Sequence, residues 1–197
     1  MVKRRRARGA SVAVWVAVLI GATAVSAQPA RNGASSDRMA GLRVGHWVQL
    51  EGTARAGNSV LCTEVRPLTG DFLDDDWSLK GLVRTVDLVR REFTVGKSRI
   101  LVSATTIYDN PRGTFKGLPD LRPGMIVEVE GALLQNGALM AVEVDDETDE
   151  IVRNPRVRDE IEIVGKISHL DPRKRVVTVM GIEFQINERT KLLSAIQ

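Results

Sequence analysis

An aromatic side chain on a strand is the first candidate for binding chemistry. Trp47 follows His46 and lies in register with Glu51, on the opposite face from Leu50. A tryptophan on the outward face could stack on a sugar or a nucleotide base, with His46 beside it. The alternative, which we favour, is packing between two β-barrels of the chain, because a repeated copy of this segment has the apolar Ile126 at the same position.

Basic side chains at two turns are the second candidate. Arg90 and Arg91 occupy one turn, and Lys174 and Arg175 occupy a turn at the matching position of a second repeat. They could contact an anionic polymer, such as a polysaccharide or the head groups of a lipid surface. Charged turns are also ordinary features of protein surfaces, so a solvated turn is the alternative.

Patterns for catalysis or metal binding are weak. The acidic run from Glu143 to Glu150 lacks the alternate spacing and the glycine of a calcium loop, so we expect a solvated linker. His46 and His169 have no cysteine or acidic residue at a zinc-site spacing. Residues 96–98 are similar to the end of a P-loop, but the upstream glycine is missing. We therefore expect no enzyme activity, no cofactor and no metal.

An internal repeat organises the elements that must position these residues. The segment from Leu42 to Val65 matches Leu121 to Val144 at a constant offset of 79, with eight identities in 24 positions. Another segment, from Gly81 to Thr106, recurs at an offset of 84 with six identities in 26 positions. Both segments show the two-residue alternation of short strands, with turns at Asn136-Gly137 and at the charged positions.

The order of the repeats predicts an all-β protein of two small OB-like five-stranded barrels. Residues 79–145 contain three strands (79–87, 91–95 and 98–103), a longer connector with room for one helical turn, and two more strands, which is the order of an OB barrel. The remaining segments, 41–66 and 160–193, supply five strands in permuted order. Pairing the two ends of the chain gives a second, circularly permuted barrel, and swapping them between molecules gives a homodimer.

The first 27 residues have the pattern of a secretory signal. A basic start precedes an apolar stretch from Ala13 to Val25, and small residues end at Ala27. We expect cleavage after Ala27 and a periplasmic or secreted protein with no stable membrane span. An uncleaved anchor is the alternative, although the apolar stretch is shorter than the ~20 residues that cross a bilayer. Residues 28–40 are small and polar, which predicts a disordered lead-in.

Removing the signal changes the charge of the chain. The whole sequence has 28 lysines and arginines against 25 aspartates and glutamates, but five of the basic residues lie in the signal. The remaining 170 residues carry 23 basic and 25 acidic side chains. Nucleic-acid binding, which draws on positive charge, is therefore not expected. The single Cys62 cannot form an internal disulfide, and we expect a small buried residue on a strand.

Residues 79–145 resemble a known family. The motifs are the runs from Leu121 to Gly131, from Asn136 to Ala141, from Gly81 to Val83 and from Phe93 to Gly96. They resemble a family of exported bacterial domains of unknown function with OB-like β-barrel repeats. The resemblance implies export and a β-barrel, and it supplies no catalytic residues.

The function expected from these patterns is a non-enzymatic periplasmic or secreted binding or interaction module, with an unknown envelope protein or polymer as partner. A self-associating structural or assembly protein of the envelope is the alternative. A binder of nucleic acid or of an anionic polymer through the OB-like face rests on fold analogy alone.

Overall fold

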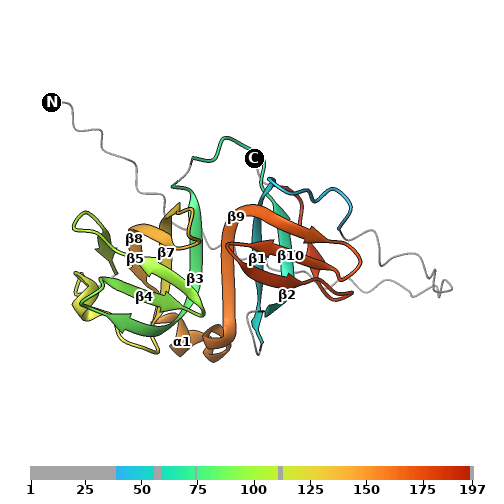
Figure 1. The fold of residues 1–197 in the computed structure, drawn as a ribbon. Coiled ribbons are helices and arrows are strands. Elements are labelled where there is room, and N and C mark those ends of the chain that lie inside the picture. The colour runs from blue at the N-terminus through green and yellow to red at the C-terminus, as the bar shows by residue number, and fades with distance from the viewer. Residues whose placement is uncertain (1–38, 56–58, 74, 111–112, 196–197) are drawn as a thin grey trace. The chain divides into compact units, whose positions relative to one another are not determined.

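A computed structural model of the chain describes residues 39–55, 59–73, 75–110 and 113–195 (Figure 1). All of these residues belong to one compact unit that spans residues 32–197. The expected signal and residues 28–38 of the expected lead-in lie outside the described residues. Met39 is described, and its side chain is buried in the core. Met39, which the prediction placed in the lead-in, is therefore part of the folded core.

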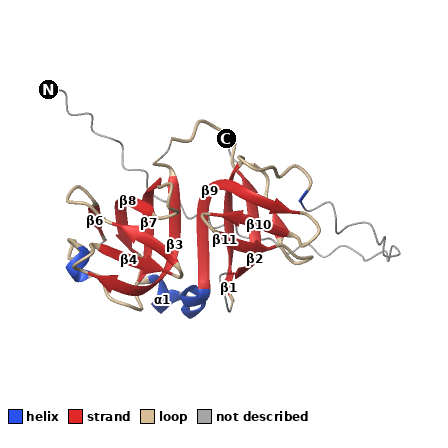
Figure 2. Cartoon of the chain, in the orientation of Figure 1, coloured by secondary structure: helices blue, strands red, loops and turns tan. Residues whose placement is uncertain are grey.

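The described chain is nearly all β (Figure 2). Its strands are β1 (Trp47–Ala54), β2 (Ser59–Pro67), β3 (Trp77–Asp87), β4 (Glu92–Val95), β5 (Ser98–Leu101), β6 (Ile107–Asp109), β7 (Ile126–Leu133), β8 (Leu139–Asp146), β9 (Glu160–Asp171), β10 (Val176–Val179), β11 (Ile182–Gln185) and β12 (Lys191–Leu192). Short helices lie at η2 (Leu118–Asp120), α1 (Glu150–Arg153) and η3 (Pro155–Asp159). No helix within the described ranges has the length and apolar character needed to cross a membrane.

The observed strands agree with the predicted ones apart from their ends and two additions. The strand predicted at 98–103 ends at Leu101, and the one predicted from residue 79 begins at Trp77. The helical turn expected in the connector is η2. Strands β6 and β12 were not predicted, because runs of two or three residues carry no recognisable alternation.

The strands form one mixed sheet that curls on itself twice. Strand pairs β3–β4, β4–β5, β5–β8, β8–β7 and β7–β3 make up the first circuit, in which only β5 and β8 run parallel. Strand pairs β1–β2, β2–β11, β11–β10, β10–β9 and β9–β1 make up the second circuit, with β2 and β11 parallel. The second circuit thus pairs segments from the two ends of the described chain within one molecule.

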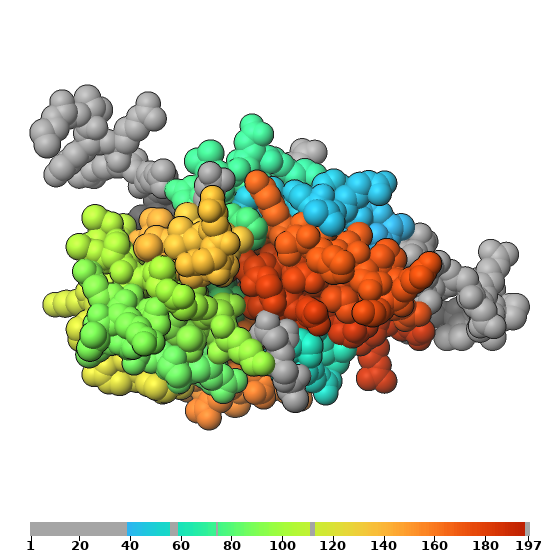
Figure 3. Space-filling view, in the orientation of Figure 1, coloured from blue at the N-terminus to red at the C-terminus, as the bar shows by residue number. Residues whose placement is uncertain are grey.

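Strands β3 and β9 join the two circuits along what we call the seam. Leu79 pairs with Ile163, and these residues occupy equivalent positions of the repeat. An antiparallel pair centred on equivalent residues relates the two circuits by an approximate twofold axis, as in a symmetric dimer. Figure 3 shows the central segment, in green and yellow, packed against the orange and red C-terminal segment on the face in view.

Residues that are identical in both repeats hold the backbone in place. Asp87 and Asp171 each accept hydrogen bonds from two backbone N–H groups of the turn that follows them. The hydroxyl of Thr106 donates to the carbonyl oxygen of Ala141 at 2.8 Å, and that of Thr190 donates to the carbonyl oxygen of Cys62 at 2.9 Å. The residues that are identical in both repeats therefore stabilise the fold and do not indicate a ligand.

The repeated glycines Gly81 and Gly165 make room for the seam. A Cβ atom on Gly165 would lie 2.5 Å from the ring of Trp77 and 2.8 Å from Val179. A Cβ atom on Gly81 would lie 2.8 Å from Ile161, the residue equivalent to Trp77. Each circuit therefore places a large side chain directly over the glycine of the other circuit. This side chain lies closer to the glycine than it could lie to a residue with a Cβ atom.

The apolar core continues across both circuits. Val127 and Val129 of β7 are fully buried, whereas Glu128 between them is half-buried, as strand alternation requires. One buried cluster includes Leu79 of the first circuit and Ile163 of the second. Cys62 is a buried residue of β2, as predicted.

We expect the substitution Gly165→Ala to destabilise the protein by about 1–3 kcal/mol, because its methyl group would overlap the Trp77 ring in a packed interface. Urea unfolding measures the change. The matched control is the same substitution in a Trp77→Leu background, where the cost of Gly165→Ala should fall by at least about 0.5 kcal/mol. An equal cost in both backgrounds would show that Trp77 is not the group that needs the space.

Candidate functional site

Trp47 lies inside the protein and not on an open face. Only 8% of its surface is exposed, and its ring centroid lies 5.0 Å from those of both Phe72 and Trp77. The ammonium group of Lys166 lies 5.3 Å from the ring centroid. The outward position considered from the sequence is therefore wrong, because β1 runs beside the seam and its tryptophan meets Trp77 of β3. The structure places Trp47 in the packing contact that we favoured.

The other residues selected from the sequence are spread over separate surfaces. His46 is exposed before β1. Arg90 and Arg91 lie in the β3–β4 turn of the first circuit, and Lys174 and Arg175 lie in the β9–β10 turn of the second. The structure thus does not gather these basic residues on one circuit, and anion binding by them stays a prediction.

The acidic run begins on a strand and not on a linker. Residues 143–146 belong to β8, where Asp145 pairs with Asp109 of β6. The carboxylates of Asp109, Glu143 and Asp145 offer oxygen atoms that all lie within 4.8 Å of one another. Oxygen ligands suit hard cations such as Ca²⁺, although exposed carboxylates also gather without a metal.

The two circuits differ most beside the seam. Trp47 and Trp77 are equivalent by the repeat to Ile126 and Ile161. The Trp47 ring contacts the rings of both Trp77 and Phe72, the latter in the linker from β2 to β3, and these aromatic side chains fill their position. Ile126 and Ile161 leave an unfilled space of about 210 Å³, which we call the seam cavity. The cavity thus lies where two isoleucines stand at the positions equivalent to the two tryptophans.

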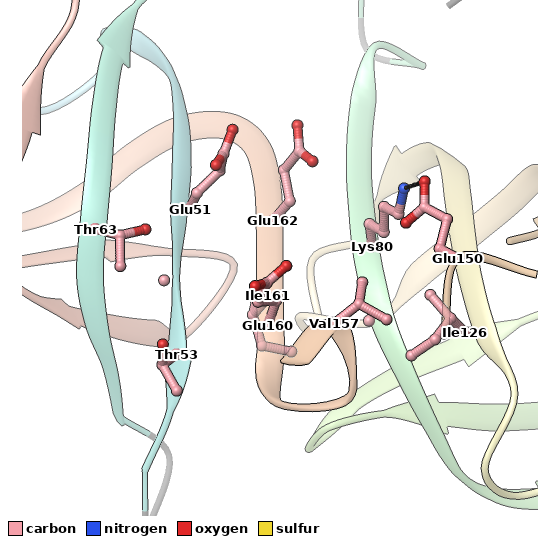
Figure 4. A pocket seen from close by; sticks show the side chains of 12 residues that line it. Glu51, Thr53, Thr63, Lys80, Ile126, Glu150, Val157, Glu160, Ile161 and Glu162 are labelled. Atoms are coloured by element: carbon pink, nitrogen blue, oxygen red, sulfur yellow. Dashed lines mark hydrogen bonds and ion pairs between the residues drawn. The ribbon is translucent and has the colours of Figure 1, made fainter. Parts of the chain in front are cut away.

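Both circuits and a linker contribute to the seam cavity (Figure 4). The stretch between the matched repeat segments is five residues longer at 145–164 than at 66–80, which accounts for the change of repeat offset from 79 to 84, and the extra residues lie mainly in the linker from β8 to β9. This longer linker forms α1 and η3, and it contributes Glu150 and Val157 to the wall. The side chains that line the cavity are Glu51, Thr53, Thr63, Lys80, Ile126, Glu150, Val157, Glu160, Ile161 and Glu162.

A row of charged residues crosses the sheet through this cavity. Successive register partners lie on the same face of neighbouring strands, so the row can be followed from strand to strand. From β12 to β6 it consists of Lys191, Glu64, Glu51, Glu162, Lys80, Glu128, Asp145 and Asp109. Six members are acidic and two are basic, so like charges stand side by side on adjacent strands. This arrangement costs stability unless a proton or a cation intervenes.

Three carboxylates in the row, those of Glu51, Glu128 and Asp145, hold protons more tightly than usual. Burial, together with the negative charges of Glu162 and Glu64, raises the pKa of Glu51 to about 7. Burial and Glu162 likewise raise the pKa of Glu128 to about 7, against the opposing effect of Lys80. The buried position of Asp145, next to Glu143 and Asp109, raises its pKa to about 7 as well.

Lys80 is already held by a partner. Its ammonium group lies 2.9 Å from Glu150 of α1. Burial lowers the pKa of Lys80, but the hydrogen bond to Glu150 and the charges of Glu147 and Glu128 outweigh it, so the pKa is raised overall. The side chain amide of Gln49 donates a hydrogen bond of 2.5 Å to Glu162. Within the described ranges, no ion pair joins the remaining carboxylates of the cavity, Glu51 and Glu160, to a lysine or an arginine.

Sequence reasoning missed this site. Its residues come from β1, β2, β3, β7, β9 and the second linker, and no short motif joins them. One signal was available: Trp47 and its equivalent Ile126 differ greatly in size within an otherwise matched segment. Such a difference between repeats marks a position that the shared fold does not require.

The comparisons with known proteins found one family model that matches a segment of the chain. Residues 80–145 match the family described as "Domain of unknown function (DUF5666)". Neither the curated proteins nor the solved structures gave a match to the chain. The matched segment corresponds to the first circuit, and Glu51, Glu160 and Glu162 of the seam cavity lie outside it.

We expect Glu51→Gln to stabilise the protein at pH 8 and to leave it unchanged near pH 4. The pKa of Glu51 is about 7 in the folded chain against 4.5 for an unperturbed glutamate. The folded state therefore keeps a proton that the unfolded state has lost, so this group makes stability fall as pH rises from about 4.5 to about 7. A neutral glutamine removes that fall, with a gain on the order of 1 kcal/mol after solvent screening at a half-buried site.

Urea unfolding at pH 4, 6 and 8 measures this effect. Glu183→Gln, which changes an exposed glutamate of β11, serves as the control and should alter stability little at any of the three pH values. A Glu51→Gln variant that loses stability at pH 8 would show that the carboxylate of Glu51 is favourably paired and not repelled.

Proposed function

We propose that this chain is an exported, non-enzymatic binding or interaction module built from two OB-like barrels, and that the seam cavity is its binding site. The two strand circuits support the OB-like interpretation. In each circuit the third and fifth strands of the barrel order run parallel and the other pairs run antiparallel. The first circuit is contiguous over 79–145, and the second combines 41–66 with 160–193 in permuted order.

Export is supported by the basic and apolar pattern of residues 1–27, with cleavage after Ala27. The non-enzymatic character is supported by the sequence, which contains no recognised arrangement of nucleophile, base and metal ligands. The proposed partner of the module is an envelope protein or an envelope polymer.

The observation that carries the proposal is the difference between the two halves at the seam. An approximate twofold relation would give equivalent packing on both sides, yet one side is filled by Trp47, Trp77 and Phe72. The other side retains a cavity with charged walls and an apolar floor. Small-ligand sites combine these two features: an apolar surface for contact area and a few polar groups for orientation.

Methyl NMR on the chain beginning at Gln28, which keeps the whole compact unit, tests the proposal. The probes are four panels: small organic cations, small organic anions, neutral sugars and short oligonucleotides. We expect at least one panel to give saturable shifts at the methyl groups of Ile126, Val157 and Ile161, because these groups line the cavity. Shifts confined to other residues, or conversion of a probe into a product, would contradict the proposal.

A self-associating envelope protein is the second candidate function. The observation in its favour is that β1 and β2 pair with β9 and β11, which lie at the other end of the chain. Two molecules could exchange these segments and form the same pairs.

Size-exclusion chromatography with light scattering separates the two candidates. The binding module should have the monomer mass at every concentration tested. A dimer fraction that grows with protein concentration and dissociates slowly on dilution would favour strand exchange instead.

A further inference from the structure

Among the described residues, aromatic side chains occupy the position in the other half of the repeat that is equivalent to the seam cavity. Two other cavities lie against the seam, one beside Trp77 and Met180 and one beside Ile161 and Gly96. These four residues form two equivalent pairs at the offset of 84, so the two cavities are counterparts and follow from the shared fold. The counterpart of the seam cavity is filled by Trp47 and its aromatic neighbours. The unfilled space is therefore specific to the position of the seam cavity.

The walls of the seam cavity carry an excess of negative charge. Glu51, Glu160 and Glu162 stand on β1 and β9, on one side of the view in Figure 4. The Lys80–Glu150 ion pair stands on the other side and is neutral as a unit. An anionic ligand would meet three carboxylates and would have to displace Glu150 from Lys80. A neutral ligand would leave the repulsion between the carboxylates unchanged.

The floor of the cavity is apolar. Ile126, Val157 and Ile161 are buried residues that face it, and the hydroxyl groups of Thr53 and Thr63 lie at its edge. A volume of about 210 Å³ is smaller than the ~300–1,000 Å³ of sites for drug-sized ligands. The space suits a short chain of methylene groups that ends in a small charged group.

We propose that the seam cavity binds a protonated primary amine carried on an aliphatic chain, with the ammonium group beside the register partners Glu51 and Glu162. This inference rests on the proposed function and names its ligand class. The ammonium group gains charge-assisted hydrogen bonds from carboxylates that repel one another when the site is empty. The methylene groups cover the isoleucine floor. A free diamine and a lysine side chain of a partner protein both present this chemistry.

The charges around Glu51 predict how binding depends on pH. Glu162 and Glu160 face it from β9, while Glu64 and Arg66 face it from β2. Together with burial they raise the pKa of Glu51 to about 7. A cation binds the ionised carboxylate, so binding should release a proton below pH 7. The affinity should rise between pH 6 and pH 8 and then level off.

Isothermal titration calorimetry on the chain beginning at Gln28 tests the inference with probes of matched length. The amine probes are 1,5-diaminopentane and lysine with both ends blocked. The comparison probes are glutarate and 1,5-pentanediol, which carry two carboxylates or two hydroxyl groups on a similar chain. We expect an amine probe to bind, more tightly at pH 8 than at pH 6, while glutarate and the diol do not bind.

Variants connect the binding to the cavity. Glu162→Gln and Glu51→Gln should each weaken amine binding by about tenfold or more, since each removes a charged partner of the ammonium group. Glu130→Gln is the matched control, because Glu130 is equivalent to Glu51 in the repeat but does not line the cavity. It should change the affinity by less than about twofold. Circular dichroism checks that each variant is folded. If one of the two cavity variants fails to fold, the other still tests the inference.

The outcomes are distinct. Binding of the diamine alone supports a free diamine as the ligand, binding of the blocked lysine alone supports a lysine of a partner, and binding of both supports the shared ammonium chemistry. Binding of glutarate or the diol in place of the amines would overturn the inference and leave the proposed function standing. Amine binding that survives both cavity substitutions would also overturn it. No binding by any of the NMR panels would overturn the inference and the proposed function together.

Discussion

The close approach of β3 and β9 is the constraint on which the rest of this structure depends. Two curled halves must bring their strands within hydrogen-bonding distance, and each half carries a large residue at the point of contact. Gly165 lies under the Trp77 ring and Gly81 lies under Ile161, so the missing side chains are what allow the pairing. The continuous sheet, its charged row and the cavity beside the seam all follow from this contact.

Two similar halves in contact need not be filled in the same way. The repeated residues, such as Asp87 and Thr106 with their equivalents, fix turns and backbone contacts and so keep the two circuits alike. The two halves differ at equivalent positions where their common fold does not depend on the side chain. Trp77 against Ile161 is one such difference, and the longer linker with α1 and η3 is another. Together they leave one side of the seam packed and the other side open.

The charges at the open side of the seam destabilise the folded state. Glu51 and Glu162 are register partners, and Lys80 is shared among several carboxylates. Neighbouring like charges in a half-buried position favour bound protons and disfavour the ionised form. Sites that store unfavourable interactions of this kind in the absence of a ligand are typical places for function, because a bound cation relieves them. The same repulsion therefore accounts for the expected pH dependence and for the ligand class.

The sequence by itself determined most of the strands and the repeat, because alternation and turn residues such as Asn136-Gly137 act over a few neighbouring positions. It also indicated that β1 and β2 need the C-terminal strands as partners, since neither end of the chain has enough strands alone. Only the tertiary structure decided that Trp47 is buried, that Asp109 lies beside Asp145, and that Lys80 stands between Glu162 and Glu128. These neighbours depend on which strands pair and in what register. That choice follows from packing over the whole seam, which no local pattern of residues records.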